Sequence, residues 1–325
     1  MKKYIAILLV AAMATLGISA CRKENSNKET KVQKDSDIKV VTTIFPEYDW
    51  VRQIAGEEAD QMDITMLLDN GVDLHSYQPT AEDIMKVSDC DLFVYVGGES
   101  DAWVDDALKQ AKNKDMQVVD LLDVLGNSAK EEEVIEGMEP EEEEEEPEYD
   151  EHVWLSVKNA EVLSKAIADA LEKVDPDHKD IYQENASAYS EKLKDLDAKY
   201  QEVVDGASQK TLLFGDRFPF RYLVDDYGLS YYAAFVGCSA ESEASFDTIS
   251  FLANKVDELG LKDIMAIENS NQKIAKTIIE NTKEKNQKIL TLDSMQSTTS
   301  DDVKNGTTYL SVMEKNLEVL KEALQ

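Results

Sequence analysis

The sequence predicts an α/β protein with two βα domains, each built on a four-stranded parallel sheet, joined by one long rigid helix. Three observations support this fold class. Short apolar runs alternate with amphipathic segments in residues 37–174, and the same alternation resumes in residues 207–325. Between them, residues 175–206 have the periodicity of a single helix, about 45 Å long at 1.5 Å per residue. Strands that alternate with helices favour parallel pairing.

The amino terminus has the features of a secretory signal over residues 1–20. Lys2 and Lys3 precede an apolar run at 5–16, which is too short for an ordinary membrane span. Small residues then lead to Cys21, an arrangement that resembles the bacterial lipoprotein signal. We therefore expect an extracytoplasmic protein anchored to the cell membrane through a lipid on Cys21, with residues 21–36 as a polar tether. The alternative is an ordinary signal peptide with an incidental cysteine.

The first domain, 37–174, is expected to contain four strands and three helices before a long acidic loop. Thr80 suits a helix N-cap, and Asp83 three residues later makes a variant of the capping box. The loop at 127–151 includes the carboxylate run 141–146, which is self-repelling and unable to pack. The expected strands are 38–44, 62–68, 91–96 and 117–119, and the expected helices are 47–56, 80–88 and 101–112.

The remaining helices and strands follow from the same kinds of pattern. A helix over 158–174 is expected to bury Val162, Ile167, Ala170 and Leu171. The linking helix should bury one side and leave His178 in solvent. Residues that we place on its buried side are Ile181, Tyr182, Ala186, Tyr189, Leu193, Leu196 and Tyr200. The second domain, 207–325, should hold strands at 211–214, 230–235, 263–267 and 288–292, and helices at 218–227, 245–259, 270–283 and 306–324.

Composition limits the partners of the chain. The formal net charge is −33 over 325 residues, which repels nucleic acid and favours cations. Besides Cys21 there are only Cys90 and Cys238, far apart in sequence, and we expect both to be free, small buried residues.

Histidines and carboxylates stand in the loops where the predicted strands end. His75 follows the strand at 62–68, and His152 ends the acidic loop after the strand at 117–119. Asp216 follows the strand at 211–214, and Asp293 follows the one at 288–292. Ligands of open parallel sheets bind at the carboxyl ends of strands, and mixed histidine and carboxylate ligation suits Zn²⁺ or Mn²⁺. Taken singly, each histidine could be a surface residue, and each aspartate a helix cap.

Several segments carry a resemblance to a known family. VVTTIFPEYDWVRQIAG, HSYQP, EHVWL and FGDRFPFRYLVDDYGL are similar to the metal-binding lipoproteins of zinc and manganese ABC importers, and the similarity covers nearly all of the mature chain. The resemblance implies two βα domains joined by a rigid helix, with the metal held by two histidines, a third His or Glu, and an acidic residue near the last strand. Carried over, these ligands include His75, His152 and Asp293.

The third ligand is where this sequence departs from the family. The usual His or Glu falls on Arg217, which cannot ligate a cation, whereas one inserted residue brings Asp216 to that position. Glu268 or a water molecule is the reserve. The second cysteine that some members place near the last strand is Met295 here, so a disulfide from Cys238 is not expected.

The resemblance implies a receptor that captures a divalent metal ion in the interdomain cleft and delivers it to an ABC permease. Zinc is favoured as the transported ligand, and a manganese receptor is the alternative. A surface adhesin or structural lipoprotein on the same fold, or a receptor for an organic solute, also stays open. We expect a monomer, and no enzyme, because no HExxH or similar helix-borne zinc motif is present.

Overall fold

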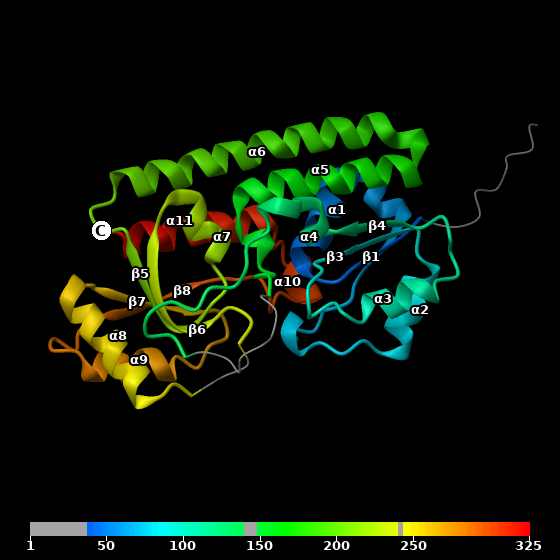
Figure 1. Cartoon of the computed structure of the whole chain (residues 1–325). Helices are drawn as coiled ribbons and strands as arrows, with labels where there is room; N and C mark the ends of the chain where they lie inside the picture. Colours follow the sequence, from blue (N-terminus) through cyan, green and yellow to red (C-terminus); the bar gives the residue numbers. More distant parts are fainter. Residues whose placement is uncertain (1–37, 140–147, 240–242) are drawn as a thin grey trace, which may run out of the picture. The chain divides into compact units, whose positions relative to one another are not determined.

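The computed structural model describes residues 38–139, 148–239 and 243–325, all of which fall in the compact unit Asp37–Gln325 (Figure 1). The predicted signal peptide 1–20, the predicted tether 21–36 with Cys21, and the carboxylate run 141–146 lie outside the described residues. Within the described part of the chain, none of the helices combines the length and apolar character needed to cross a membrane.

The first half is a parallel four-stranded sheet, as predicted. Its strand order is β2-β1-β3-β4, and every pairing is parallel. The strands are β1 (Ile38–Thr42), β2 (Met62–Met66), β3 (Leu92–Tyr95) and β4 (Gln117–Asp120). The helices are α1 (Phe45–Ala55), α2 (Ala81–Asp89), α3 (Val104–Lys109) and α4 (Leu121–Leu125).

Local capping explains where these helices begin. Thr80 and Asp83 form the predicted capping box of α2. Helix α1 begins two residues before the predicted start, because Pro46 is tolerated in the first turn and Glu47 accepts hydrogen bonds from backbone N–H groups before the helix. Helix α3 begins later than predicted. The carboxylate of Asp101 turns inward instead and accepts hydrogen bonds from the N–H groups of residues 96 and 97.

The second half is also a parallel sheet, in the order β6-β5-β7-β8. Its strands are β5 (Thr211–Phe218), β6 (Ser230–Val236), β7 (Asp263–Ile267) and β8 (Lys288–Leu292). The helices are α7 (Arg221–Tyr227), α8 (Phe246–Leu259), α9 (Lys273–Asn281), α10 (Ser300–Lys304) and α11 (Tyr309–Ala323). Two sheets of four strands each therefore confirm the predicted fold class.

Strand β5 is four residues longer than predicted. After a register shift between Phe214 and Arg217, pairing with β6 resumes at Arg217 opposite Phe235 and Phe218 opposite Val236. The helix that was predicted to start at 218 therefore begins only at Arg221. As a consequence, Asp216 lies within a strand and not in the loop that follows it.

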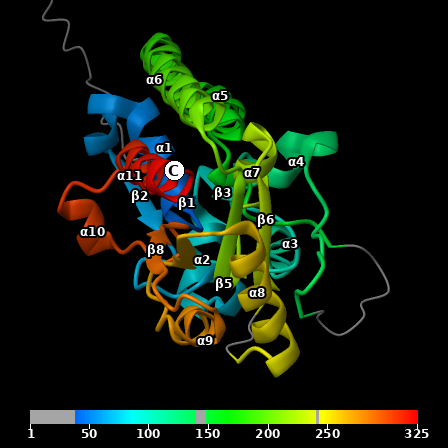
Figure 2. The same cartoon turned by 90° about the vertical axis from the view of Figure 1, so that its left-hand side faces the viewer.

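Two long helices connect the halves. Helix α5 (Val157–Val174) leads through the short turn Pro176–His178 into α6 (Lys179–Gly206), which has 28 residues. Helix α6 contacts α1 and α5 of the first half and α7 and α11 of the second, and it lies alongside α5 in both views (Figures 1 and 2). It thus bridges the two sheets. Its buried residues are Tyr182, Tyr189, Leu193, Leu196, Tyr200 and Val204.

Three predicted positions on these helices were wrong. Val162 is 50% exposed and Ile181 is 39% exposed, so neither side chain lies on the buried face of its helix. His178 is not free in solvent. Its Nδ1 lies 2.6 Å from Asp175 Oδ2, which fixes the turn between α5 and α6.

The larger hydrophobic core runs through both halves, and hydrogen bonds join them at Trp154. The indole N–H of Trp154 donates to the carbonyl of Ser294 at 2.8 Å, and the hydroxyl of Tyr309 donates to the carbonyl of Trp154 at 2.8 Å. Both aromatic side chains are fully buried. Because Trp154 is two residues after His152, this contact fixes the segment that carries one of the predicted ligands.

Candidate metal site

His75 is held on a short turn that follows β2. The turn is the 3-10 helix Leu74–Ser76, and the side chain of Asp73 caps it by accepting the N–H of His75 at 3.1 Å. The imidazole Nδ1 lies 2.9 Å from Ser100 Oγ and 3.3 Å from Glu151 Oε2. Burial acts to raise the pKa of Glu151, but its contacts with His75 and Ser100 outweigh burial and hold that pKa below the usual value. The Nε2 atom of His75 is left to face the second histidine.

His152 is fully buried and oriented by Asp150. The Oδ1 atom of Asp150 lies 2.9 Å from His152 Nδ1 and accepts the His152 backbone N–H at 2.8 Å. Burial acts to lower the pKa of His152, but the neighbouring Asp150 carboxylate outweighs it and raises that pKa. A carboxylate that holds one imidazole nitrogen is the usual support of a metal-ligating histidine, because it fixes the tautomer and the ring.

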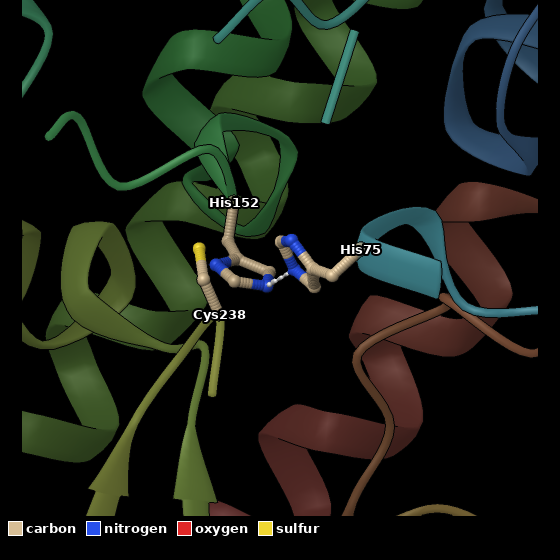
Figure 3. Close-up of side chains that lie close together, drawn as sticks. All are labelled: His75, His152 and Cys238. Carbon is tan, nitrogen blue, oxygen red and sulfur yellow. Dashed lines mark hydrogen bonds between the residues drawn. The ribbon is translucent and has the colours of Figure 1, made fainter. Parts of the chain in front are cut away.

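The two imidazoles meet through their Nε2 atoms, which are 3.1 Å apart (Figure 3). Zinc–nitrogen bonds of about 2.0–2.1 Å at a tetrahedral angle place two nitrogens about 3.3 Å apart. The spacing of this histidine pair therefore matches what one zinc ion needs. The structure brings together the two residues that the sequence had placed in separate loops.

Cys238 is the residue of this site that sequence reasoning missed. Ligand atoms of His75, His152 and Cys238 all lie within 4.8 Å of one another, the single such group of three or more that the described residues contain. Cys238 and Cys90 are both free, as expected, and Cys238 is only partly buried. The one signal in the sequence was its position just after a strand, here β6, which it shares with the predicted ligands.

Asp216 does not join the histidine pair in this structure. Its Oδ1 accepts the N–H of Arg217 at 3.0 Å, and its buried Oδ2 has no hydrogen-bond partner among the described residues. It lines a cavity of about 360 Å³ together with Asp73 and Glu268. Arg217, on which the resemblance places the third ligand when no residue is inserted, pairs with the carboxylate of Asp73. The guanidinium thereby supports the turn that carries His75.

Asp293 and Glu268 form a second acidic group, after β8 and β7. Asp293 Oδ1 accepts the N–H of Met295 at 2.8 Å, and Glu268 accepts the N–H and hydroxyl of Ser294 at 2.7 and 2.6 Å. Burial raises the pKa of both carboxyl groups, and for Glu268 the charge of Asp293 adds to the increase. Like Asp216, they stand outside the group that His75 and His152 form with Cys238.

Two parallel βα halves bridged by a long helix, with two imidazoles facing each other where the strands of the first sheet end, are features of metal-binding substrate-binding proteins. The family model described as zinc-uptake complex component A, periplasmic, matches residues 40–323, and this chain belongs to that family. It is a family of metal-binding transport receptors and not of enzymes.

Individual relatives agree with this assignment. The zinc-binding lipoprotein AdcA of Streptococcus pneumoniae is 34% identical over 319 residues, which are 97% of this chain and 60% of AdcA. This chain thus spans less than two thirds of AdcA. The high-affinity zinc uptake system protein ZnuA of Bacillus subtilis is 31% identical over 330 residues, 99% of this chain and 98% of ZnuA. The crystal structure of the Zn(II)-bound ZnuA-like domain of S. pneumoniae AdcA is similar with a TM-score of 0.70 and 32% identity, covering 89% of this chain and 99% of that domain.

Proposed function

We propose that this chain is an extracytoplasmic receptor that captures Zn²⁺ with His75 and His152 and delivers it to the permease of an ABC importer. The observation that carries the proposal is the 3.1 Å separation of the two Nε2 atoms, each on a ring whose other nitrogen faces a carboxylate or hydroxyl group. Relatives named for zinc binding and zinc uptake support the choice of metal.

Zinc is also the ion that this chemistry favours. Imidazole nitrogens bind Zn²⁺ more strongly than Mn²⁺ in the general order of divalent metals. The second half supplies acidic side chains within β5 and just after β7 and β8, and we assign Asp216 and Asp293 as candidate further ligands of the loaded form, with Glu268 as the reserve. They would have to approach the histidine pair for this, and the ion would then lie in the cleft between the domains 37–174 and 207–325.

The architecture suits capture with little change of shape. The hydrogen bonds of Trp154 with Ser294 and Tyr309 tie the two halves together next to His152, and α6 packs against both. Closure around the ion is therefore a small local movement. A lipid on Cys21 would keep the loaded receptor at the outer face of the membrane, where the permease can accept its cargo.

Metal binding is tested by competitive titration of the full-length protein in detergent with Zn²⁺ and Mn²⁺. We expect one tightly bound Zn²⁺ per chain, lost in His75→Ala and in His152→Ala. His178→Ala is the matched control, because His178 is the only other histidine and bonds to Asp175 on the linking turn. Absence of zinc binding by the unaltered protein, or equal binding by all three variants, would overturn the proposal.

Delivery is tested by uptake of radioactive zinc in cells that lack the gene for this chain. The unaltered gene and the His178→Ala gene should restore uptake, whereas the His75→Ala/His152→Ala gene should not. Full restoration by the double variant would show that transport does not pass through this site. Removal of Cys21 should release the receptor from the cell and reduce uptake without affecting zinc affinity.

A further inference from the structure

We infer that Cys238 is the third protein ligand of the metal, so that His75, His152 and a thiolate form a His₂Cys site selective for zinc over manganese. The inference rests on the proposed function and names a ligand that the sequence comparison with the family does not suggest. The fourth position is left to water or to an acidic side chain of the second half.

The first support is the grouping of the three side chains. Their ligand atoms lie within 4.8 Å of one another, and Figure 3 shows the sulfur of Cys238 beside the imidazole of His152. Zinc–sulfur bonds of about 2.3 Å and zinc–nitrogen bonds of about 2.0 Å at a tetrahedral angle put sulfur about 3.5 Å from nitrogen. Each separation therefore exceeds the bonded value by at most about 1.3 Å, and a shift of no more than roughly that size would bring each pair to it. The single side-chain torsion of Cys238, on the turn after β6, can supply such a movement.

The second support is that the backbone is built to hold Cys238 against His152. A Cβ atom at Gly237 would lie 2.9 Å from Cε1 and 3.0 Å from Nδ1 of His152, so only glycine allows this approach. On the other side, the N–H of Cys238 donates to Glu132 Oε1 at 3.2 Å. Two contacts therefore position the cysteine. One is the packing of Gly237 against the imidazole of His152, and the other is the hydrogen bond to the carboxylate of Glu132 in the acidic loop.

Binding of Zn²⁺ by Cys238 exchanges a proton for the metal and changes no oxidation state. When Zn²⁺ binds, the S–H bond of Cys238 breaks, a Zn–S bond forms, and the proton leaves to the solvent. The ion stays divalent, and with two neutral imidazoles and one thiolate the net charge of the complex is +1. Thiolate is a soft ligand that suits Zn²⁺, whereas Mn²⁺ prefers oxygen. Cys238 would therefore act as the residue that determines metal specificity.

The test uses Co²⁺ as a coloured substitute for zinc in the full-length protein. Cobalt bound through a thiolate shows a charge-transfer absorption in the near ultraviolet, which imidazole and carboxylate ligands do not produce. We expect this absorption in the unaltered protein and its loss in Cys238→Ser. Cys90→Ser is the matched control and should keep it, because Cys90 lies at the end of α2 and its thiol donates to the carbonyl of Val87.

Zinc and manganese titrations of the same proteins give a second measurement. Loss of a supporting contact around a metal usually costs about 10- to 100-fold in affinity, so loss of a ligand should weaken zinc by at least about tenfold. Manganese affinity should change little in Cys238→Ser. The expected result is a reduced preference for zinc. Unchanged zinc affinity in Cys238→Ser, with no charge-transfer band in the unaltered protein, would overturn the inference and leave the proposed function intact.

Alkylation of Cys238 provides a test that needs no substitution at this position. Zinc should protect Cys238 from a maleimide in the unaltered protein, as measured on the peptide that carries it, and should not protect it in His75→Ala. Equal alkylation with and without bound zinc would overturn the inference. If the unaltered protein binds neither Co²⁺ nor Zn²⁺, the proposed function itself fails.

Discussion

Gly237→Ala should disturb the metal site through a steric contact alone. The added Cβ would stand 2.9 Å from Cε1 of His152, whereas carbon atoms pack at about 3.5–4.0 Å, so the overlap is about 0.6–1.1 Å. Retreat of the backbone is blocked, because the carbonyl oxygen of Phe218 would lie 3.0 Å from the same Cβ. The imidazole therefore has to give way or the strain has to remain.

The size of the effect follows from these two outcomes. Overpacking of this kind costs about 1–3 kcal/mol. If the strain remains, the free energy of unfolding of the metal-free protein falls by that amount. If His152 moves aside, zinc binding has to restore the strained position, and the affinity falls by about 5- to 150-fold.

Urea unfolding without metal and competitive zinc titration together measure both outcomes. Gly206→Ala is the control, because Gly206 ends α6 and a Cβ there meets nothing within 4 Å. It should leave zinc affinity unchanged and alter stability by no more than about 1 kcal/mol. If Gly237→Ala keeps the unfolding midpoint and the zinc affinity of the unaltered protein, the close contact between Gly237 and His152 is refuted.

Three further predictions concern buried polar groups. Burial raises the pKa of Asp101 to about 7, against about 3.9 in an unfolded chain, so the folded protein holds the extra proton between these values and stability falls as pH rises through that window. Asp101→Asn should flatten this slope in urea titrations and stabilise the protein near pH 7 by up to about 4 kcal/mol. Tyr309→Phe removes the hydrogen bond to the carbonyl of Trp154 and should lower the free energy of unfolding by about 1–3 kcal/mol, whereas an unchanged midpoint would contradict the role given to that bond. Because Asp150 raises the pKa of His152, protons should compete with zinc at a higher pH than they would at an ordinary histidine, and Asp150→Asn should move the loss of zinc affinity to lower pH in titrations across the range.

Much of the fold could be predicted because it depends on local signals. The alternation of apolar runs with helical periodicity predicted both parallel sheets, and the Thr80–Asp83 capping box formed as expected, since its two residues lie within one turn. The extension of β5 could not be predicted. It depends on pairing with β6 after an irregularity at Phe214–Arg217, and periodicity within one strand carries no information about its neighbour.

The candidate site, like the fold, could be predicted only in part. His75 and His152 were predicted as a pair because both are histidines in loops after strands and both lie in motifs typical of the family, and the structure joins them. Cys238 was predicted only to be a free, buried cysteine. Its place beside His152 depends on the close approach of Gly237, a contact between residues 85 positions apart in the sequence.

The class of fold, the acidic character, the expected membrane address and the two histidines could be predicted from the sequence, because composition, periodicity and short motifs do not depend on how distant residues pack. The groups that support those histidines, and the third side chain beside them, are known only from the folded structure. Asp150 holds one ring, Ser100 and Glu151 hold the other, and Cys238 is nearer to the pair than Asp216 is. These distances depend on how separate strands and loops pack, and packing is set by the whole core at once.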